Sequence, residues 1–154
     1  MAETGWVTLS NAAMGLIPQI QEDTNAIISL SRENISTQRH MNYETAKIEA
    51  DYRKQKNAIQ EPYLAMRNSR PALDSDEYKE WSQNFADKKE DYQSQLADLS
   101  DLVEQLKSEV QEEANELVTQ NNEEIETRKT QKEAKQAQYQ EYSQAAKNGA
   151  SGKN

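Results

Sequence analysis

The chain has 154 residues, of which 29% are charged and 34% hydrophobic, and its formal net charge is −9. Aromatic residues make up only 6%, and with 4 glycines and 3 prolines there are few residues for the turns of a β-rich fold. The acidic balance disfavours nucleic acid as a partner, because phosphate binding requires clustered lysines and arginines. The composition therefore predicts an elongated all-α protein with a thin apolar seam.

Residues 1–19, MAETGWVTLSNAAMGLIPQ, are small and apolar, with Glu3 as the only charged side chain. They lack the basic start and the clear cleavage site of a secretory signal, and no run approaches the roughly 18–20 apolar residues that span a bilayer. Two interpretations stay open: a segment packed on the rest of the fold, or a segment for docking, assembly or export. The candidate interaction residues in it are Trp6, Val7, Leu9, Met14, Leu16 and Ile17.

Residues 20–68 show a seven-residue pattern that predicts one long helix. Pro62 predicts a kink or an interruption of this helix just before it, because proline has no N–H group to donate. The pattern is polar for a coiled coil, with Asn34 in one of its rows. The seam residues predicted in this helix are Ile27, Met41, Ile48, Tyr52 and Ile59.

Residues 69–74 are predicted to form a turn, after which the sequence DSDEYKEW starts a second helix. Asp74 is expected to accept from the free N–H groups of the first turn, and Glu77 completes a capping box. Three aromatic residues follow near the turn: Tyr78, Trp81 and Phe85. They either close the end of the fold or form an exposed tip that holds a partner, because Trp and Tyr are favoured in interfaces.

Residues 75–147 contain no glycine or proline and predict a second, longer helix, followed by a flexible tail at residues 148–154. Apolar residues recur at alternating steps of three and four, which is typical of a coiled coil. Past Ile125 the pattern dissolves into polar residues with almost nothing to bury. The seam residues predicted here are Tyr92, Leu96, Leu99, Val103, Leu106, Val110, Leu117 and Ile125.

The two helices are predicted to form an antiparallel two-helix coiled-coil hairpin that turns near residue 71. In that register Ile48 lies opposite Leu96, and Ile27 lies near Leu117. Ile17 and Ile20 then lie near Ile125, where the seam of the second helix ends. A hairpin this thin buries little apolar surface, so we expect it to associate with itself or with another helical protein.

The residues that would carry catalysis or metal binding are missing. There is no cysteine and only one histidine, His40, so a transition-metal site is not expected. The segment around Asp74 lacks the glycine and the spacing of an EF-hand loop, and no glycine-rich phosphate loop occurs. We therefore expect a non-enzymatic protein without a cofactor, a metal ion, a small-molecule substrate, a nucleic-acid partner or a transmembrane span.

The acidic cap DSDEYKEW followed by a helix with spaced aromatics, together with the N-terminal stretch TGWVTLSNAAMG, resembles the small helical-hairpin components of flagellar and type III secretion systems. These comprise filament and needle subunits, stalk proteins and chaperones. The resemblance implies export by a Sec-independent route or a cytoplasmic location. The C-terminal QAAKNGASGKN departs from filament and needle subunits, which end in an apolar helix.

Three functions stay open at this stage. The first is a structural subunit that self-associates, filament-like or associated with secretion. The second is a cytoplasmic coiled-coil chaperone or adaptor that binds a partner helix. The third is a structural or scaffold component of a phage or virion, because acidic, helix-rich chains without cysteine also suit that role.

Overall fold

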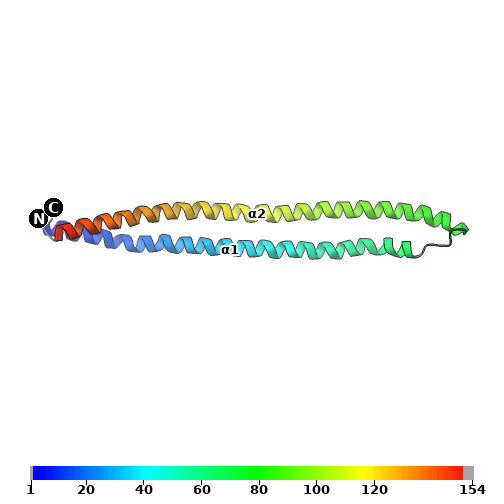
Figure 1. The fold of residues 1–154 in the computed structure, drawn as a ribbon, viewed down its shortest axis with the longest axis horizontal. Helices are drawn as coiled ribbons and strands as arrows, with labels where there is room; N and C mark the ends of the chain where they lie inside the picture. The colour runs from blue at the N-terminus through cyan, green and yellow to red at the C-terminus, as the bar shows by residue number, and fades with distance from the viewer. Residues whose placement is uncertain (1, 151–154) are drawn as a thin grey trace. The chain divides into compact units, whose positions relative to one another are not determined.

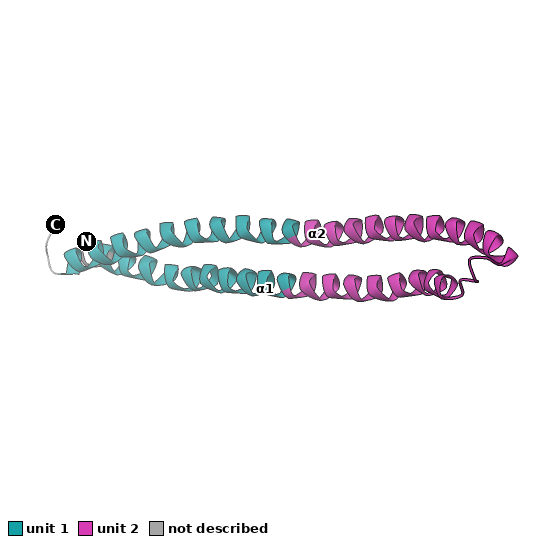
Figure 2. Ribbon diagram, turned by 45° about the vertical axis from the view of Figure 1, so that its right-hand side comes forward, with its two compact units in different colours: residues 1–38, 115–154 teal, residues 39–114 magenta. Residues whose placement is uncertain are grey.

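The computed structural model describes residues 2–150, with side chains from Gly5 onward, and these residues form an all-α helical hairpin. Helix α1 spans Ala2–Asn68, residues 69–75 form the connector, and helix α2 spans Asp76–Ala150 (Figure 1). The chain divides into two compact units. Unit 1 comprises residues 1–38 and 115–154, and unit 2 comprises residues 39–114 (Figure 2). In each unit a segment of α1 runs antiparallel to a segment of α2.

Helix α1 is longer than the sequence pattern predicts. Residues 2–19 are its first turns and not a separate segment, and the helix continues through both Pro18 and Pro62. The predicted interruption before Pro62 is therefore wrong. Both prolines are exposed, so water can reach the carbonyl group that each leaves without its helical N–H partner. Pro62 lines an open groove beside the seam residues Ile59 and Tyr63, which hold the helix against α2. Helix α2 also continues to Ala150, which includes residues 148–150 of the predicted tail.

The connector closes differently from the predicted cap. Helix α2 begins at Asp76, and the Ser75 carbonyl accepts from the Tyr78 N–H at 3.2 Å. The backbone N–H and the hydroxyl of Ser75 both donate to the Ala72 carbonyl, at 3.0 and 2.6 Å. Ser75, and not Asp74, is therefore the residue that joins the turn to the helix. Asp76 and Glu77 place negative charge at the positive end of the helix dipole, as the sequence predicts.

The register of the hairpin differs from the predicted one. Glu49 pairs with Lys107 at 3.0 Å, so Ile48 lies at a level of α2 well beyond Leu96. The connector explains the shift: it runs on past the end of α1 before α2 turns back (Figure 1). The first turns of α2 thus lie beyond the last turn of α1. Each residue of α1 therefore pairs with a residue of α2 that has a higher number than the predicted partner. One consequence is that residues 136–149 of α2, predicted to have little to bury, pack on the first turns of α1.

The seam of α2 departs from a seven-residue period between residues 99 and 125. Leu99, Val103, Ala114 and Ile125 are buried, and Val110 and Val118 are half-buried between them. These positions recur every eleven residues (99, 110 and 121; 103, 114 and 125), so over this range the seam drifts away from a strict heptad. The prediction is wrong for Leu106 and Leu117, which are 39% and 43% exposed. The other predicted seam residues are half-buried: Ile27, Met41, Ile48, Tyr52, Ile59, Tyr92 and Leu96.

Candidate interaction surface

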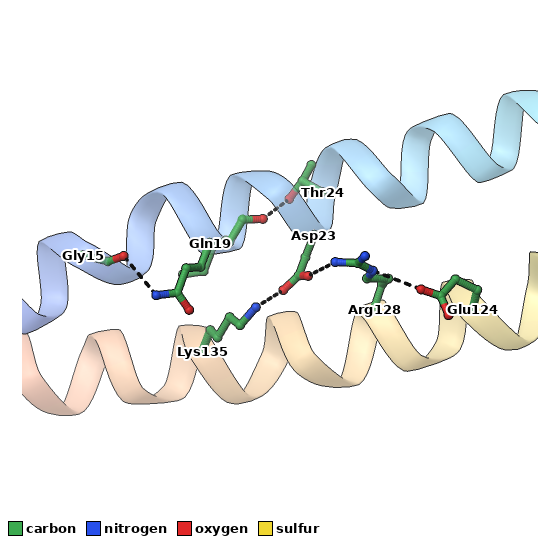
Figure 3. A network of polar contacts seen from close by, with 8 residues as sticks. Gly15, Gln19, Asp23, Thr24, Glu124, Arg128 and Lys135 are labelled. Carbon is green, nitrogen blue, oxygen red and sulfur yellow. Dashed lines mark hydrogen bonds and ion pairs between the residues drawn. The ribbon is translucent and has the colours of Figure 1, made fainter.

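The seam of unit 1 contains a buried ion cluster. Asp23 of α1 has a side chain that is only 1% exposed. Its two carboxylate oxygens accept from Lys135 Nζ at 2.8 Å and from Arg128 Nη1 at 3.1 Å, both on α2 (Figure 3). Arg128 Nε also donates to Glu124 at 3.2 Å. Both oxygens of the buried carboxylate are therefore paired, which a charge in a helix interface requires.

The electrostatics of this cluster follow from its geometry. The hydrogen bond from Lys135 lowers the pKa of the Asp23 carboxyl below its ordinary value of 3.8, and the hydrogen bond from Arg128 adds to it, against the opposing effect of burial. The same contacts raise the pKa of Arg128, with Asp23 as the largest cause. Asp23 is thus held ionised, and it ties one level of α1 to two turns of α2.

Two further contacts fix the register of unit 1. Asn34 donates to Asn122 and accepts from Asn121, each at 3.0 Å, which forms a polar layer in the seam. At the other end Gly149 meets Trp6 so closely that a Cβ on residue 149 would lie 2.9 Å from the Trp6 Cβ. Glycine is required there because it lets the two helices approach each other. Polar and close contacts, more than bulky apolar ones, therefore align this unit.

Beside this seam, α1 carries exposed apolar side chains at regular steps. They share one side of the helix, because four of them lie at multiples of seven residues. Their members are Val7, Met14, Ile17, Ile28 and Ile35, with Met14 63% and Ile35 54% exposed. The positions between them on the same side are Ser10, Gln21, Thr24 and Ser31, all uncharged. We call these nine residues the α1 flank.

The α1 flank borders an open groove between the two helices of unit 1. Ile17, Ile20 and Gln21 line it from α1, and Gln136, Tyr139 and Gln140 line it from α2, around a volume of about 490 Å³. None of the lining side chains is charged, and the apolar part of the lining comes from two isoleucines and a tyrosine ring. Such a groove suits an apolar side chain better than a charged ligand.

Near the turn, unit 2 packs four aromatic rings against one another, whereas its Tyr43 is 64% exposed. Tyr63 stacks on Tyr92 with ring centres 4.5 Å apart and on Phe85 at 5.4 Å. Phe85 stacks on Trp81 at 4.8 Å, and the Trp81 indole N–H donates to the Met66 carbonyl near the end of α1. These rings are half-buried and pack on one another, which favours the interpretation that they close the turn end of the hairpin.

The predicted N-terminal interaction residues separate into two groups. Leu16 is buried against α2, and Trp6 and Leu9 are half-buried, so they belong to the seam. Val7, Met14 and Ile17 are exposed and lie on the α1 flank. Sequence reasoning missed Ile28 and Ile35 as members of the same surface. Their seven-residue spacing from Val7 and Met14 was the available signal.

The described residues offer little for other kinds of site. Among the side chains that the structure describes, from residue 5 to residue 150, no group of three or more acidic or histidine side chains is arranged to hold a metal ion. His40 is exposed, with its Nε2 4.0 Å from Glu44 one turn on. No helix in the described part of the chain is long and apolar enough to cross a membrane. The α1 flank and its groove are therefore the strongest candidate for a functional surface.

Comparison with known proteins adds no relative to this description. No protein family, no curated protein and no solved structure matches the chain.

Proposed function

We propose that this chain is a non-enzymatic structural protein, a helical-hairpin subunit that self-associates. The observation that carries the proposal is the α1 flank. Helix α1 already buries one apolar stripe against α2, yet it presents a second one to solvent. A soluble helix normally places charged residues on that side, so a second apolar stripe indicates a further packing contact.

The surroundings of the flank support the same interpretation. Residues 5–31 of α1 contain only two charged side chains, Glu22 and the buried Asp23. The exposed apolar side chains of this stretch are costly to leave in water, and its lack of charge removes the like-charge repulsion that would keep copies apart. Acidic residues are densest on α2 between residues 98 and 126, which hold ten acidic side chains and one basic side chain.

The association with a secretion or filament system is the finer part of this proposal. It rests on the uncharged N-terminal residues with their Ser, Thr and Asn content, which now form the start of α1. Deletion of residues 1–19 is a poor test, because it would also remove the buried Ala13 and Leu16 and destabilise unit 1. Substitutions of exposed residues are required instead.

The proposal is tested by multi-angle light scattering of the purified chain over a wide concentration range, with electron micrographs of the same samples. Mass that rises with concentration, or regular assemblies on the grids, is the expected result. A monomer at every concentration would contradict self-association and would favour an adaptor that binds a different helical protein.

A further inference from the structure

The α1 flank has the spacing of a coiled-coil seam. Its nine positions, from residue 7 to residue 35, follow one another at strictly alternating steps of three and four. The same alternation defines the a and d positions through which two helices pack. Helix α1 therefore carries two seams, one occupied by α2 and one without a partner in the hairpin.

The second seam matches itself when one copy runs antiparallel to another. In one register Met14 meets Ser31 and Ser10 meets Ile35, so a large side chain faces a small one. At the centre Gln21 meets Thr24, which pairs two polar side chains. Between centre and ends, Ile17 meets Ile28. Each pair occurs twice, as a two-fold symmetric contact requires.

The groove gives this register a specific apolar anchor. Ile17 lines the groove together with Ile20 and Tyr139, so the Ile28 of an antiparallel second copy would enter it. Ile28 is exposed in the hairpin, which leaves its side chain accessible for this contact. An apolar side chain seated in a preformed pocket is the usual form of an interface hot spot.

The flank by itself is smaller than a standard interface. It spans 28 residue steps from residue 7 to residue 35, or about 42 Å of helix, and one helix width of about 10 Å gives roughly 400 Å² per partner. A standard specific interface buries roughly 800 Å² per partner, so the contact must also include the α2 side of the groove at Gln136, Tyr139 and Gln140.

We propose that the α1 flank is the contact between two copies of this chain, packed antiparallel about a two-fold axis near Gln21 and Thr24. This inference rests on the proposed self-association and adds the surface, the direction and the anchoring residue. Assembly then starts from a symmetric dimer through unit 1.

The test compares two variants with the same added charge on adjacent residues. Ile28→Glu places a carboxylate in the groove of the partner, whereas Ser29→Glu places it on an exposed side of α1 away from the flank. Sedimentation equilibrium measures the dimer dissociation constant of each. We expect an increase on the order of 100-fold for Ile28→Glu, because the loss occurs twice across the axis, and little change for Ser29→Glu. Circular dichroism confirms that both remain helical.

A cross-linking experiment tests the direction of packing. The chain has no cysteine, so single substitutions label one site each. Gln21→Cys lies beside the proposed axis and should give a covalent dimer with a short bismaleimide, whereas Ser29→Cys should not.

The outcomes separate the two proposals. If the native chain stays monomeric at all concentrations, both self-association and this contact are wrong. If it self-associates but Ile28→Glu and Ser29→Glu behave alike, only the assignment of the surface is wrong. Dimers that cross-link equally through residues 21 and 29 would overturn the two-fold arrangement.

Discussion

The two units place their polar and apolar residues in opposite ways. Unit 1 buries an ion cluster in its seam, where Asp23 meets Arg128 and Lys135, and exposes the isoleucines of the α1 flank. Unit 2 stacks half-buried aromatic rings near the turn, and charged residues are frequent in its sequence. The same two helices thus form a seam without a neighbouring uncharged apolar stripe in unit 2, and a seam with such a stripe beside it in unit 1.

The difference teaches where the hairpin needs a partner. Exposed leucines occur in unit 2 as well, but charges limit them to a short patch: Leu102 and Leu106 lie between Asp98 and Glu109 on the same side of α2. In unit 1 no charge interrupts the flank. An apolar residue among charges is ordinary for a protein surface, whereas an uncharged stripe indicates an interface.

The largest expected effect is at the ion cluster of unit 1. Asp23→Asn removes the anion that pairs with both Lys135 and Arg128. Loss of the central member of an ion cluster is destabilising, because Lys135 loses its carboxylate in a partly buried position and Arg128 keeps only Glu124. We expect Asp23→Asn to lower the melting temperature more than any other single substitution considered. Circular dichroism at 222 nm measures the melting.

The matched control for that experiment is Glu22→Gln, which removes one negative charge from the adjacent, exposed position. Its melting temperature should stay close to that of the native chain. Equal melting temperatures for the two variants would show that Asp23 matters only through net charge and would remove the main contrast between the units.

The second-largest effect on stability is expected at the aromatic stack of unit 2. Tyr63→Ala removes the ring that contacts both Phe85 and Tyr92, and we expect a loss of about 2 kcal/mol of unfolding free energy, measured by urea denaturation. Leu64→Ala, at the next residue, should cost much less, because Leu64 is exposed. A small effect of Tyr63→Ala would mean that the turn end of the hairpin is held by the connector alone.

The hairpin itself could be predicted from the sequence, because two long apolar patterns separated by a proline-containing turn have one simple solution. Its register could not, because it depends on the path of residues 69–75 through space and not on their number. The eleven-residue repeat of the α2 seam could not be predicted either. Leu106 and Leu117 fit the heptad spacing although they are exposed, and the buried Ala114 is too small to mark a seam position in the sequence.

The candidate surface was partly predictable. Val7, Met14 and Ile17 were identified as interaction residues, but the assumption that the helix starts at residue 20 separated them from Ile28 and Ile35. Asp23 also had a signal: it interrupts a row of leucines at residues 9, 16 and 30. A charge within an apolar row predicts a buried partner, and the basic residues after Ile125 supply it.

A pH titration sharpens the comparison at the ion cluster. The pKa of Asp23 is lower in the folded chain than its ordinary value, so its contribution to stability is fully present above that value. It is lost as the pH falls below 3.8 and through the lower folded-state pKa. The gap in unfolding free energy between the native chain and Asp23→Asn should therefore be constant near neutral pH and narrow in acid. A gap that stays constant down to the acid limit would contradict the ion cluster.

The smallest effects are expected at two glycines of unit 1 that differ in their surroundings. A Cβ at Gly15 meets no atom within 4 Å, so Gly15→Ala should stabilise α1 by about 0.5–1 kcal/mol through helix propensity alone.

A Cβ at Gly149 would lie 2.9 Å from the Trp6 Cβ, which is fixed to the backbone and cannot move away as the end of a side chain can. Gly149→Ala should therefore lose that gain and push the end of α2 away from Trp6, seen as a red-shifted Trp6 fluorescence in a Trp81→Phe background. Equal stabilisation by both alanines, with unchanged fluorescence, would show that α2 does not approach α1 closely at this end, and the register assigned to unit 1 would then rest on Asp23 and Asn34.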